Sequence, residues 1–241
     1  MNLHIFICSG SLPATIIPPV KGEVHLWYLA SGALPNVLSE EASTAFMHSL
    51  SHDECVRRDS FHFSHDARNF AMARGFLRNV LGAYCNDAPH TLQFTYGPCG
   101  KPSLTHDSPI SFNLSHSGED IVIGITHKTD DLGVDIELFR DIDDLENLLN
   151  AFHSDEKAFI KKQPRPLQPE QFFRLWTCKE AVIKATGEGL SRSLQSFCIS
   201  MVSPTAITFA THPKRSSAQW ELATPELAPN LFCAVALRQS T

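Results

Sequence analysis

Two stretches far apart in the sequence constrain the fold most: LGVDIEL at 132–138 and FFRLWTCKEAVIK at 172–184. The first is typical of a strand, and it carries Asp135 and Glu137 two positions apart, which places both carboxylates on one face. The second has apolar residues at helical spacing. The chain must therefore bring an acidic strand and an amphipathic helix into one fold.

The acidic residues of these stretches predict a bound cation. Asp135 and Glu137 would repel each other, and crowding raises the pKa of both carboxyls unless a cation holds them. Glu180 and Lys184 lie one turn apart on the helix, which alone would be a surface ion pair worth about 0.2–0.5 kcal/mol. If the helix packs beside the acidic strand, the simpler interpretation of these acidic residues is a site for a hard cation.

The predicted order of elements repeats once along the chain. A long helix is followed by several strands over residues 66–127, and the same order returns over 170–237. This is a repeat of pattern and not of residues. We therefore predict an α+β fold with two similar halves in tandem, residues 1–128 and 129–241, and a ligand-binding cleft where they meet.

Capping residues predict where the helices begin. Ser39 would cap a helix that starts at Glu40. Asp66 would cap the long helix of the first half, and Ser154 a short helix of the second. The main helix is predicted to end near Gly187.

Composition excludes several classes of protein. A net charge of −6 argues against general binding to nucleic acid or anionic membranes. The seven cysteines are scattered without a CxxC pair, which favours reduced thiols in the cytosol over a disulfide framework or a zinc site. No stretch approaches the roughly 20 apolar residues of a membrane span, and the N-terminal run lacks a basic signal-peptide region. We expect a cytoplasmic protein.

Two shorter stretches carry further candidate residues: GKP at 100–102 and FNLSHSG at 112–118. The second places Ser115 and His116 at a strand end, just before a glycine turn. Each stretch is a weak signal alone. A nucleophile and its base usually come from separated positions, so adjacent Ser and His are not a catalytic dyad. Lys101 before a proline is typical of a turn.

The motifs are more specific together than singly. GKP, NLSHSG, LxVDIE and WTxKEAxxKxxGxGL, in this order, closely resemble the surfactin-synthetase type of 4′-phosphopantetheinyl transferase over about residues 57–194. The resemblance implies a pseudo-twofold monomer of two α+β halves with coenzyme A bound at the seam. It also implies Mg²⁺ dependence and an apo acyl or peptidyl carrier protein as the second substrate.

The resemblance assigns metal and catalytic roles. Asp135, Glu137 and Glu180 match the family's magnesium carboxylates, in agreement with the preference of Mg²⁺ for oxygen ligands. Lys184 matches a lysine that neutralises charge on the transferring phosphate or relays the serine proton. The base that takes this proton is either Glu180 or a water on the metal, and the sequence does not choose between them.

The resemblance also assigns coenzyme A contacts. Ser115 and His116 match residues that contact its phosphates, and Lys101 matches a phosphate-contacting lysine. Trp176 matches the family's aromatic marker and is expected to serve packing.

Two arginines are candidates for the 3′-phosphate of coenzyme A. Arg57 lies where the family often has a base, and Arg68 is placed by its position on the long helix. Glu54 lies one turn before Arg57, and an acid there is expected to repel the phosphate. The alternative for both arginines is a solvated face.

The implied reaction transfers the 4′-phosphopantetheine arm of coenzyme A to a carrier serine and releases 3′,5′-ADP. Such a transfer needs positioning and charge neutralisation more than covalent help. Two alternatives stay open: a magnesium-dependent hydrolase of a pyrophosphate-containing nucleotide, and a non-catalytic carrier-binding module. The acidic set alone fits the hydrolase equally well, but the full motif string and the intact carboxylates favour the transferase.

Overall fold

The computed structural model describes residues 1–9, 12–30, 40–189, 192–203, 206–209 and 219–239. Its helices are α1 (Glu40–His48), α2 (His52–Asp59), α3 (Ser64–Cys85), α4 (Leu145–Leu149), α5 (Ser154–Lys162) and α6 (Gln168–Thr186). Its strands are β1 (Asn2–Cys8), β2 (Glu23–Leu29), β3 (Phe94–Tyr96), β4 (Pro102–Leu104), β5 (Ile110–Ser117), β6 (Asp120–His127), β7 (Asp130–Leu138), β8 (Ile199–Ser203), β9 (Ala206–Phe209), β10 (Gln219–Ala223) and β11 (Leu231–Gln239). Among the described helices, none is long and apolar enough to cross a membrane.

The two larger sheets have the same internal plan. The first has the order β1-β2-β6-β5, in which only β1 and β2 are parallel. The second has the order β10-β11-β7 and is antiparallel throughout. In each, a strand (β2 or β7) leads into helices, then a small hairpin (β3–β4 or β8–β9), then two strands that complete the sheet. The prediction of an α+β fold is confirmed, and the predicted repeat extends to the strand that precedes the helices.

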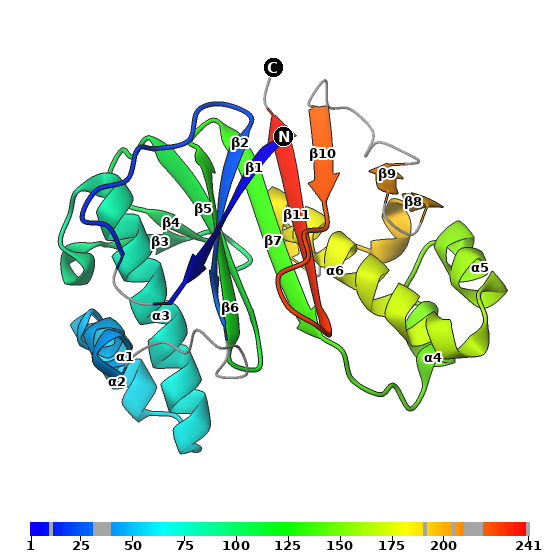
Figure 1. Cartoon of the computed structure of the whole chain (residues 1–241), viewed down its shortest axis with the longest axis horizontal. Coiled ribbons are helices and arrows are strands. Elements are labelled where there is room, and N and C mark those ends of the chain that lie inside the picture. The colour runs from blue at the N-terminus through cyan, green and yellow to red at the C-terminus, as the bar shows by residue number, and fades with distance from the viewer. Residues whose placement is uncertain (10–11, 31–39, 190–191, 204–205, 210–218, 240–241) are drawn as a thin grey trace.

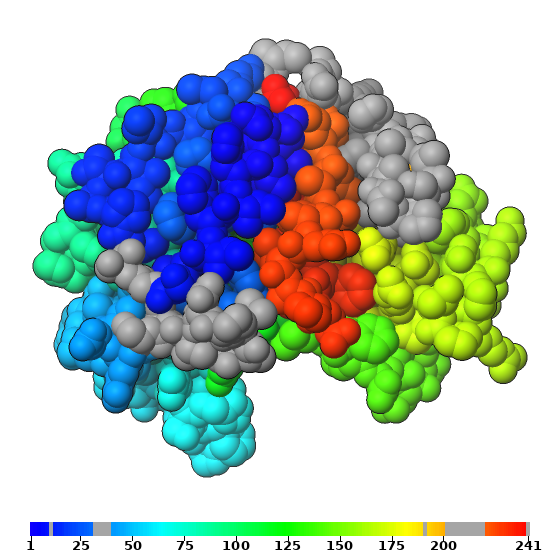
Figure 2. Space-filling view, viewed as in Figure 1, coloured from blue at the N-terminus to red at the C-terminus, as the bar shows by residue number. Residues whose placement is uncertain are grey.

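The two sheets pack face to face between two long helices (Figure 1). The α3 helix buries Phe76, Leu77 and Val80 against the first sheet, and α6 buries Leu175 and Val182 against the second. A third apolar cluster lies between the sheets and draws on both halves, from β2 and β6 on one side and β7 and β11 on the other. On the face shown in Figure 2, the N-terminal segment lies directly against β10 and β11. The halves therefore share part of their core.

The sheets also meet edge to edge, where β5 lies beside β7. Side chains on alternate residues of β5 accept hydrogen bonds from backbone N–H groups of β7. The Oδ1 of Asn113 accepts from Val134 at 2.8 Å, the Oγ of Ser115 from Ile136 at 3.4 Å, and the Oγ of Ser117 from Leu138 at 3.0 Å. This polar stripe places Ser115 directly opposite the acidic residues of β7.

The helix ends correct two predicted caps. The α3 helix begins at Ser64 with Phe63 as its N-cap, so Asp66 lies within the first turn. There its carboxylate still faces the positive end of the helix dipole. His153, not Ser154, caps α5, because its Nδ1 accepts the backbone N–H of Asp155 at 3.3 Å. Ser39 lies outside the described residues.

Candidate active site

A glycine brings α6 close enough to β7 to form the site. A Cβ atom added to Gly133 would lie 1.9 Å from the backbone oxygen of Ala181, so no larger residue fits between strand and helix. Gly133, Asp135 and Glu137 alternate along β7 and share the face that meets α6. Glu180 and Lys184 directly precede Ala181 and Ala185, the two residues of α6 whose backbone lies against Gly133. The two stretches predicted to work together are thus in contact.

Asp135 is the most enclosed acid of the group. Its side chain is 6 % exposed, and its Oδ1 accepts hydrogen bonds from the Nζ of Lys184 at 2.6 Å and the Oγ of Ser115 at 2.9 Å. Lys184 Nζ also donates to Ser115 Oγ at 2.8 Å. Burial raises the pKa of Asp135, and the ammonium group of Lys184 opposes that rise. The site therefore joins β5, β7 and α6 through one charged triangle.

Two buried carboxylate oxygens of the site lack hydrogen-bond partners. They are Oδ2 of Asp135 and Oε1 of Glu180. Burial raises the pKa of Glu180, and the negative charges of Asp135 and Glu137 raise it further while Lys184 lowers it. Buried acceptors of this kind are costly unless something pairs with them. The donor set and its unpaired oxygens fit a hard cation.

Glu137 is held from two sides. Its Oε1 accepts a hydrogen bond from the indole Nε1 of Trp176 at 3.1 Å. Its Oε2 accepts from Nη1 of Arg140 at 3.2 Å and from Oγ of Ser117 at 3.4 Å. The expectation that Trp176 serves packing is thus only part of its role, because it stacks near Phe152 and also orients an acidic residue of the site.

The three carboxylates do not converge as tightly as a bound ion would hold them. Among the described residues, two groups of three side chains each place their ligand atoms within 4.8 Å of one another, as a metal site requires. Neither group includes Asp135, Glu137 or Glu180. Lys184 and Trp176 hold two of these carboxylates in the arrangement seen. A cation would have to draw the acids together.

Ser115 and His116 lie on the same strand but face differently. Ser115 is buried in the triangle with Asp135 and Lys184, whereas His116 is exposed. Although the ring of His116 is open to solvent, nearby protein displaces enough water to lower its pKa, and the positive charge of Lys184 lowers it further. His116 is therefore neutral at neutral pH, available as a hydrogen-bond donor at the edge of the site.

Lys101 lies on the β3–β4 turn and reaches across to the second half. Its Nζ donates to the backbone oxygens of Leu132 and Ala185, both at 2.9 Å. Burial lowers its pKa to about 8. Lys101 also lines a cavity of about 540 Å³ between the halves, together with Asp131 and Gly187. It is placed at the seam, but no hydrogen bond joins it to the carboxylate group.

Arg57 and Arg68 are both exposed. The guanidinium of Arg57 lies 5.2 Å from the ring centroid of Phe70 on α3. Glu54, which was expected to repel a phosphate beside Arg57, is paired within the protein. It is buried and accepts hydrogen bonds from Nε of Arg74 at 2.6 Å and Nε of Arg78 at 2.5 Å. These arginines neutralise Glu54, so the expected repulsion beside Arg57 is wrong.

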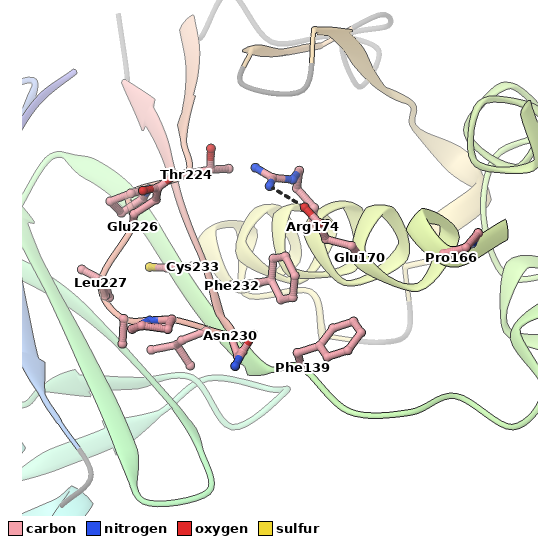
Figure 3. A pocket seen from close by; sticks show the side chains of 14 residues that line it. Phe139, Pro166, Glu170, Arg174, Thr224, Glu226, Leu227, Asn230, Phe232 and Cys233 are labelled. Carbon is pink, nitrogen blue, oxygen red and sulfur yellow. Dashed lines mark hydrogen bonds and ion pairs between the residues drawn. The ribbon is translucent and has the colours of Figure 1, made fainter. Parts of the chain in front are cut away.

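A second cavity, of about 620 Å³, lies near the start of α6 (Figure 3). Phe139, Arg174 and Phe232 line it, and Nη2 of Arg174 donates to Oε1 of Glu170 at 3.2 Å. None of its lining residues belongs to the carboxylate group or its lysine. This cavity is therefore separate from the candidate active site.

Family models cover most of the chain. A model described as the 4′-phosphopantetheinyl transferase superfamily matches residues 131–236. A second, described as 4′-phosphopantetheinyl transferase, N-terminal, matches residues 38–128. The first match contains all three candidate metal carboxylates, and the second contains Lys101, Ser115 and His116.

Similar proteins carry the same family name. The 4′-phosphopantetheinyl transferase HetI of Nostoc sp. is 34% identical over 222 residues, which cover 90% of this chain and 88% of that protein. The 4′-phosphopantetheinyl transferase psf-1 of Bacillus pumilus is 34% identical over 148 residues, covering 61% and 62%. Sfp of Bacillus subtilis, another, is 28% identical over 162 residues, covering 67% and 71%. The chain belongs to the 4′-phosphopantetheinyl transferase family, which confirms the resemblance read from its motifs.

Proposed function

We propose that this protein transfers the 4′-phosphopantetheine arm of coenzyme A to a serine of an apo acyl or peptidyl carrier protein and releases 3′,5′-ADP. One observation carries the proposal for this site. Three carboxylates lie on β7 and α6 where the halves join, two of them have unpaired buried oxygens, and one is bonded to Lys184, in a chain of this family. Transfer between phosphate oxygens requires this kind of charge placement.

Mg²⁺ is the cofactor that the donor set fits. Asp135, Glu137 and Glu180 would hold it, since Mg²⁺ takes oxygen ligands and commonly shares them with substrate phosphates. When bound, the ion would supply charge neutralisation at the pyrophosphate. The unpaired oxygens of Asp135 and Glu180 support this role, because a cation would satisfy both.

Lys184 is the residue best placed to meet phosphate charge. It already bridges Asp135 and Ser115, and its side chain is 29 % exposed on the open side of the site. Ser115 and His116 would donate hydrogen bonds to the phosphates of coenzyme A. Lys101 would contact the same substrate from the seam, and Arg57 and Arg68 would meet its 3′-phosphate from α2 and α3.

Glu180 is our candidate for the general base. Burial raises the pKa of Glu180 in the metal-free site, and its carboxylate has two oxygens. One would hold the ion, and the other would accept the proton of the attacking serine. Because the negative charge of Asp135 raises the pKa of Glu180, the charge of the site affects how readily Glu180 accepts a proton.

We further infer that the protein acts as a monomer in the cytoplasm and is built of two domains, residues 1–128 and 129–241. The sheet changes between β6 and β7, close to that division. Free cysteines at all seven positions support a reducing compartment.

The experiment is intact mass spectrometry of several apo carrier proteins incubated with this protein, coenzyme A and Mg²⁺. We expect a mass gain of one phosphopantetheine arm, lost when EDTA is added. Asp135→Ala and Glu180→Gln should abolish the gain, whereas Glu41→Gln, an exposed carboxylate on α1, should not. Near-normal transfer by either active-site variant would refute the metal assignment.

The same assay separates the alternatives. Coenzyme A consumed without a carrier mass gain would indicate a hydrolase. Carrier binding with no turnover on any carrier would indicate a binding module. Formation of 3′,5′-ADP only when carrier is present would establish transfer.

A further inference from the structure

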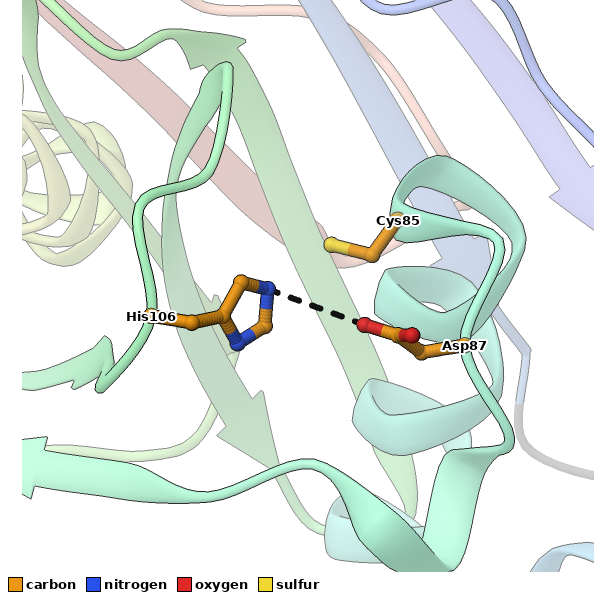
Figure 4. A group of neighbouring side chains, drawn as sticks. All are labelled: Cys85, Asp87 and His106. Atoms are coloured by element: carbon orange, nitrogen blue, oxygen red, sulfur yellow. Dashed lines mark ion pairs between the residues drawn. The ribbon is translucent and has the colours of Figure 1, made fainter.

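A second group of metal-binding side chains lies at the C-terminal end of α3, apart from the three carboxylates, and its His106 also lines the cavity that Lys101 lines. Cys85, Asp87 and His106 each offer one ligand atom, and these atoms all lie within 4.8 Å of one another (Figure 4). We propose that Cys85, Asp87 and His106 form a binding site for Zn²⁺, with a water molecule as the fourth ligand. The absence of a CxxC pair hid this site from sequence reasoning, because its ligands come from two separate segments.

Backbone structure fixes the two ligands at the end of α3. Cys85 is the last residue of the helix, and Asn86 takes a left-handed conformation with φ of 57°. The backbone N–H of Asp87 then bonds to the oxygen of Gly82 at 3.1 Å. This turn is a standard helix ending, and it points the next residue back toward the helix. Figure 4 shows Cys85 and Asp87 both directed at the ring of His106.

The third ligand comes from the loop between β4 and β5. The backbone N–H of Thr105 bonds to the oxygen of Gln93 at 3.0 Å, which anchors this loop to β3. The Oγ of Ser108 accepts the N–H of Ile110 at 3.4 Å and lies 3.6 Å from the Sγ of Cys85. The loop is thus tied on both sides of His106.

The spacing of the ligand atoms suits a tetrahedral ion after a small contraction. Nε2 of His106 and Oδ2 of Asp87 are 3.7 Å apart. In tetrahedral zinc sites, where bonds to nitrogen and oxygen are about 2.0–2.2 Å, two such ligand atoms lie about 3.3–3.6 Å apart. Both side chains are exposed, so their rotamers are free to make this adjustment.

The mixture of ligands selects a borderline-soft metal. Thiolate, imidazole and carboxylate together suit Zn²⁺ and do not suit Mg²⁺, which takes oxygen. The thiol of Cys85 releases its proton to solvent when the sulfur–metal bond forms. The two metal sites of the chain would therefore differ in the ion they bind.

The other close group, His153, Asp155 and Cys198, is a weaker candidate. Its histidine Nδ1 already accepts the N–H that caps α5. Cys198 is buried. In contrast, the ligand atoms of the first group face one another and no strong hydrogen bond competes for them. The second group serves as the internal comparison in the experiment.

The test uses the full-length protein, freed of metal by a chelator and then held in excess Mg²⁺ to occupy the carboxylate site. Bound zinc per chain is measured by elemental analysis after gel filtration. Binding of Co²⁺ is followed by its thiolate-to-metal charge-transfer absorption. We expect one zinc per chain and a cobalt–thiolate band. Cys85→Ser and His106→Ala should each weaken zinc binding by more than the about 10–100-fold that loss of an outer-shell partner of a metal ligand costs.

Two controls keep the result interpretable. Cys55→Ser removes a thiol of similar, intermediate exposure and should leave zinc binding unchanged. Cys198→Ser should also leave it unchanged. Since His106 is exposed, His106→Ala is expected to fold even if Cys85→Ser does not. Unchanged zinc binding in His106→Ala, or loss confined to Cys198→Ser, would overturn the proposal.

Discussion

The negative charge of Glu180 makes the folded protein less stable at neutral pH than a neutral side chain at this position would. Its pKa in the folded state is raised above the ordinary value of 4.5, first by burial and then by Asp135. The folded protein therefore holds this proton more tightly than the unfolded chain does. The free energy of unfolding consequently falls as pH rises from about 4.5 through the raised folded value.

Glu180→Gln should raise the melting temperature at neutral pH in the absence of Mg²⁺. The gain is expected to be about 2–4 °C for each 1 kcal/mol removed from the unfavourable burial. The gain should shrink as the pH falls and disappear below about 4.5, where Glu180 of the wild type is protonated in both the folded and the unfolded state. Differential scanning calorimetry across pH measures both effects. A variant less stable than wild type at neutral pH would contradict the unpaired state of this carboxylate.

Added Mg²⁺ should make wild type more stable than Glu180→Gln, the reverse of the order expected without the ion. A ligand that binds only the folded state stabilises it by an amount that grows with the logarithm of the ligand concentration above its dissociation constant. Wild type is expected to gain stability as Mg²⁺ is added, while Glu180→Gln gains little because one ligand is missing. Equal gains in both proteins would place the ion elsewhere.

Trp176→Phe tests the hydrogen bond that orients Glu137. Phenylalanine keeps the aromatic packing near Phe152 and Phe172 but cannot donate to Oε1 of Glu137. We expect the Mg²⁺ concentration for half-maximal transfer to rise about 10–100-fold, as for other residues that orient metal ligands. The melting temperature should change little. A large loss of stability with no change in the Mg²⁺ requirement would show that Trp176 serves packing alone.

At the scale of elements, the contact between β7 and α6 depends on Gly133. Gly133→Ala would place a methyl group 1.9 Å from the backbone oxygen of Ala181, so the helix would have to move away. Overpacking of this kind costs about 1–3 kcal/mol. We expect this loss in urea unfolding, together with a fall in transfer, because Glu180 and Lys184 move with the helix.

Gly97→Ala is the matched control. An added Cβ there would meet only the oxygen of Lys101 at 3.7 Å, an ordinary contact. Its stability should stay within about 0.5 kcal/mol of wild type, as for most surface substitutions. Equal effects of the two substitutions would argue against close packing at Gly133.

Sequence patterns located the elements well because they depend on local periodicity. The acidic strand, the main helix and its end at Gly187 follow from alternation, helical spacing and a left-handed cap with φ of 70°. The cap predictions failed where several polar residues compete at one helix start, as Ser64 and Asp66 do. A histidine cap such as His153 has no strong sequence signal.

Contacts across the fold were the part that sequence could not supply. The bonds of Trp176 to Glu137, of Arg74 and Arg78 to Glu54, and of Lys101 to two carbonyls join residues far apart in the chain. One signal was available and unused: Asn113, Ser115 and Ser117 alternate, which indicated a polar stripe along one side of β5.

At the scale of the whole molecule, the shared core predicts cooperative unfolding. The cluster between the sheets takes Leu26 and Val122 from the first half, and Val134 and Val235 from the second. Neither half can lose its structure without exposing the apolar face of the other. We expect one transition by calorimetry, with equal calorimetric and van't Hoff enthalpies. Two separated transitions would show that the halves at 1–128 and 129–241 are independent domains.

The polar stripe of β5 also affects the tendency of the protein to aggregate. An open strand edge is a template on which another chain can add a strand and begin to aggregate. Along β7, the N–H groups of Val134, Ile136 and Leu138 are already occupied by side chains of β5. The seam that holds the reactive groups thereby also closes a route to polymerisation, so mutations that loosen it would threaten solubility as well as activity.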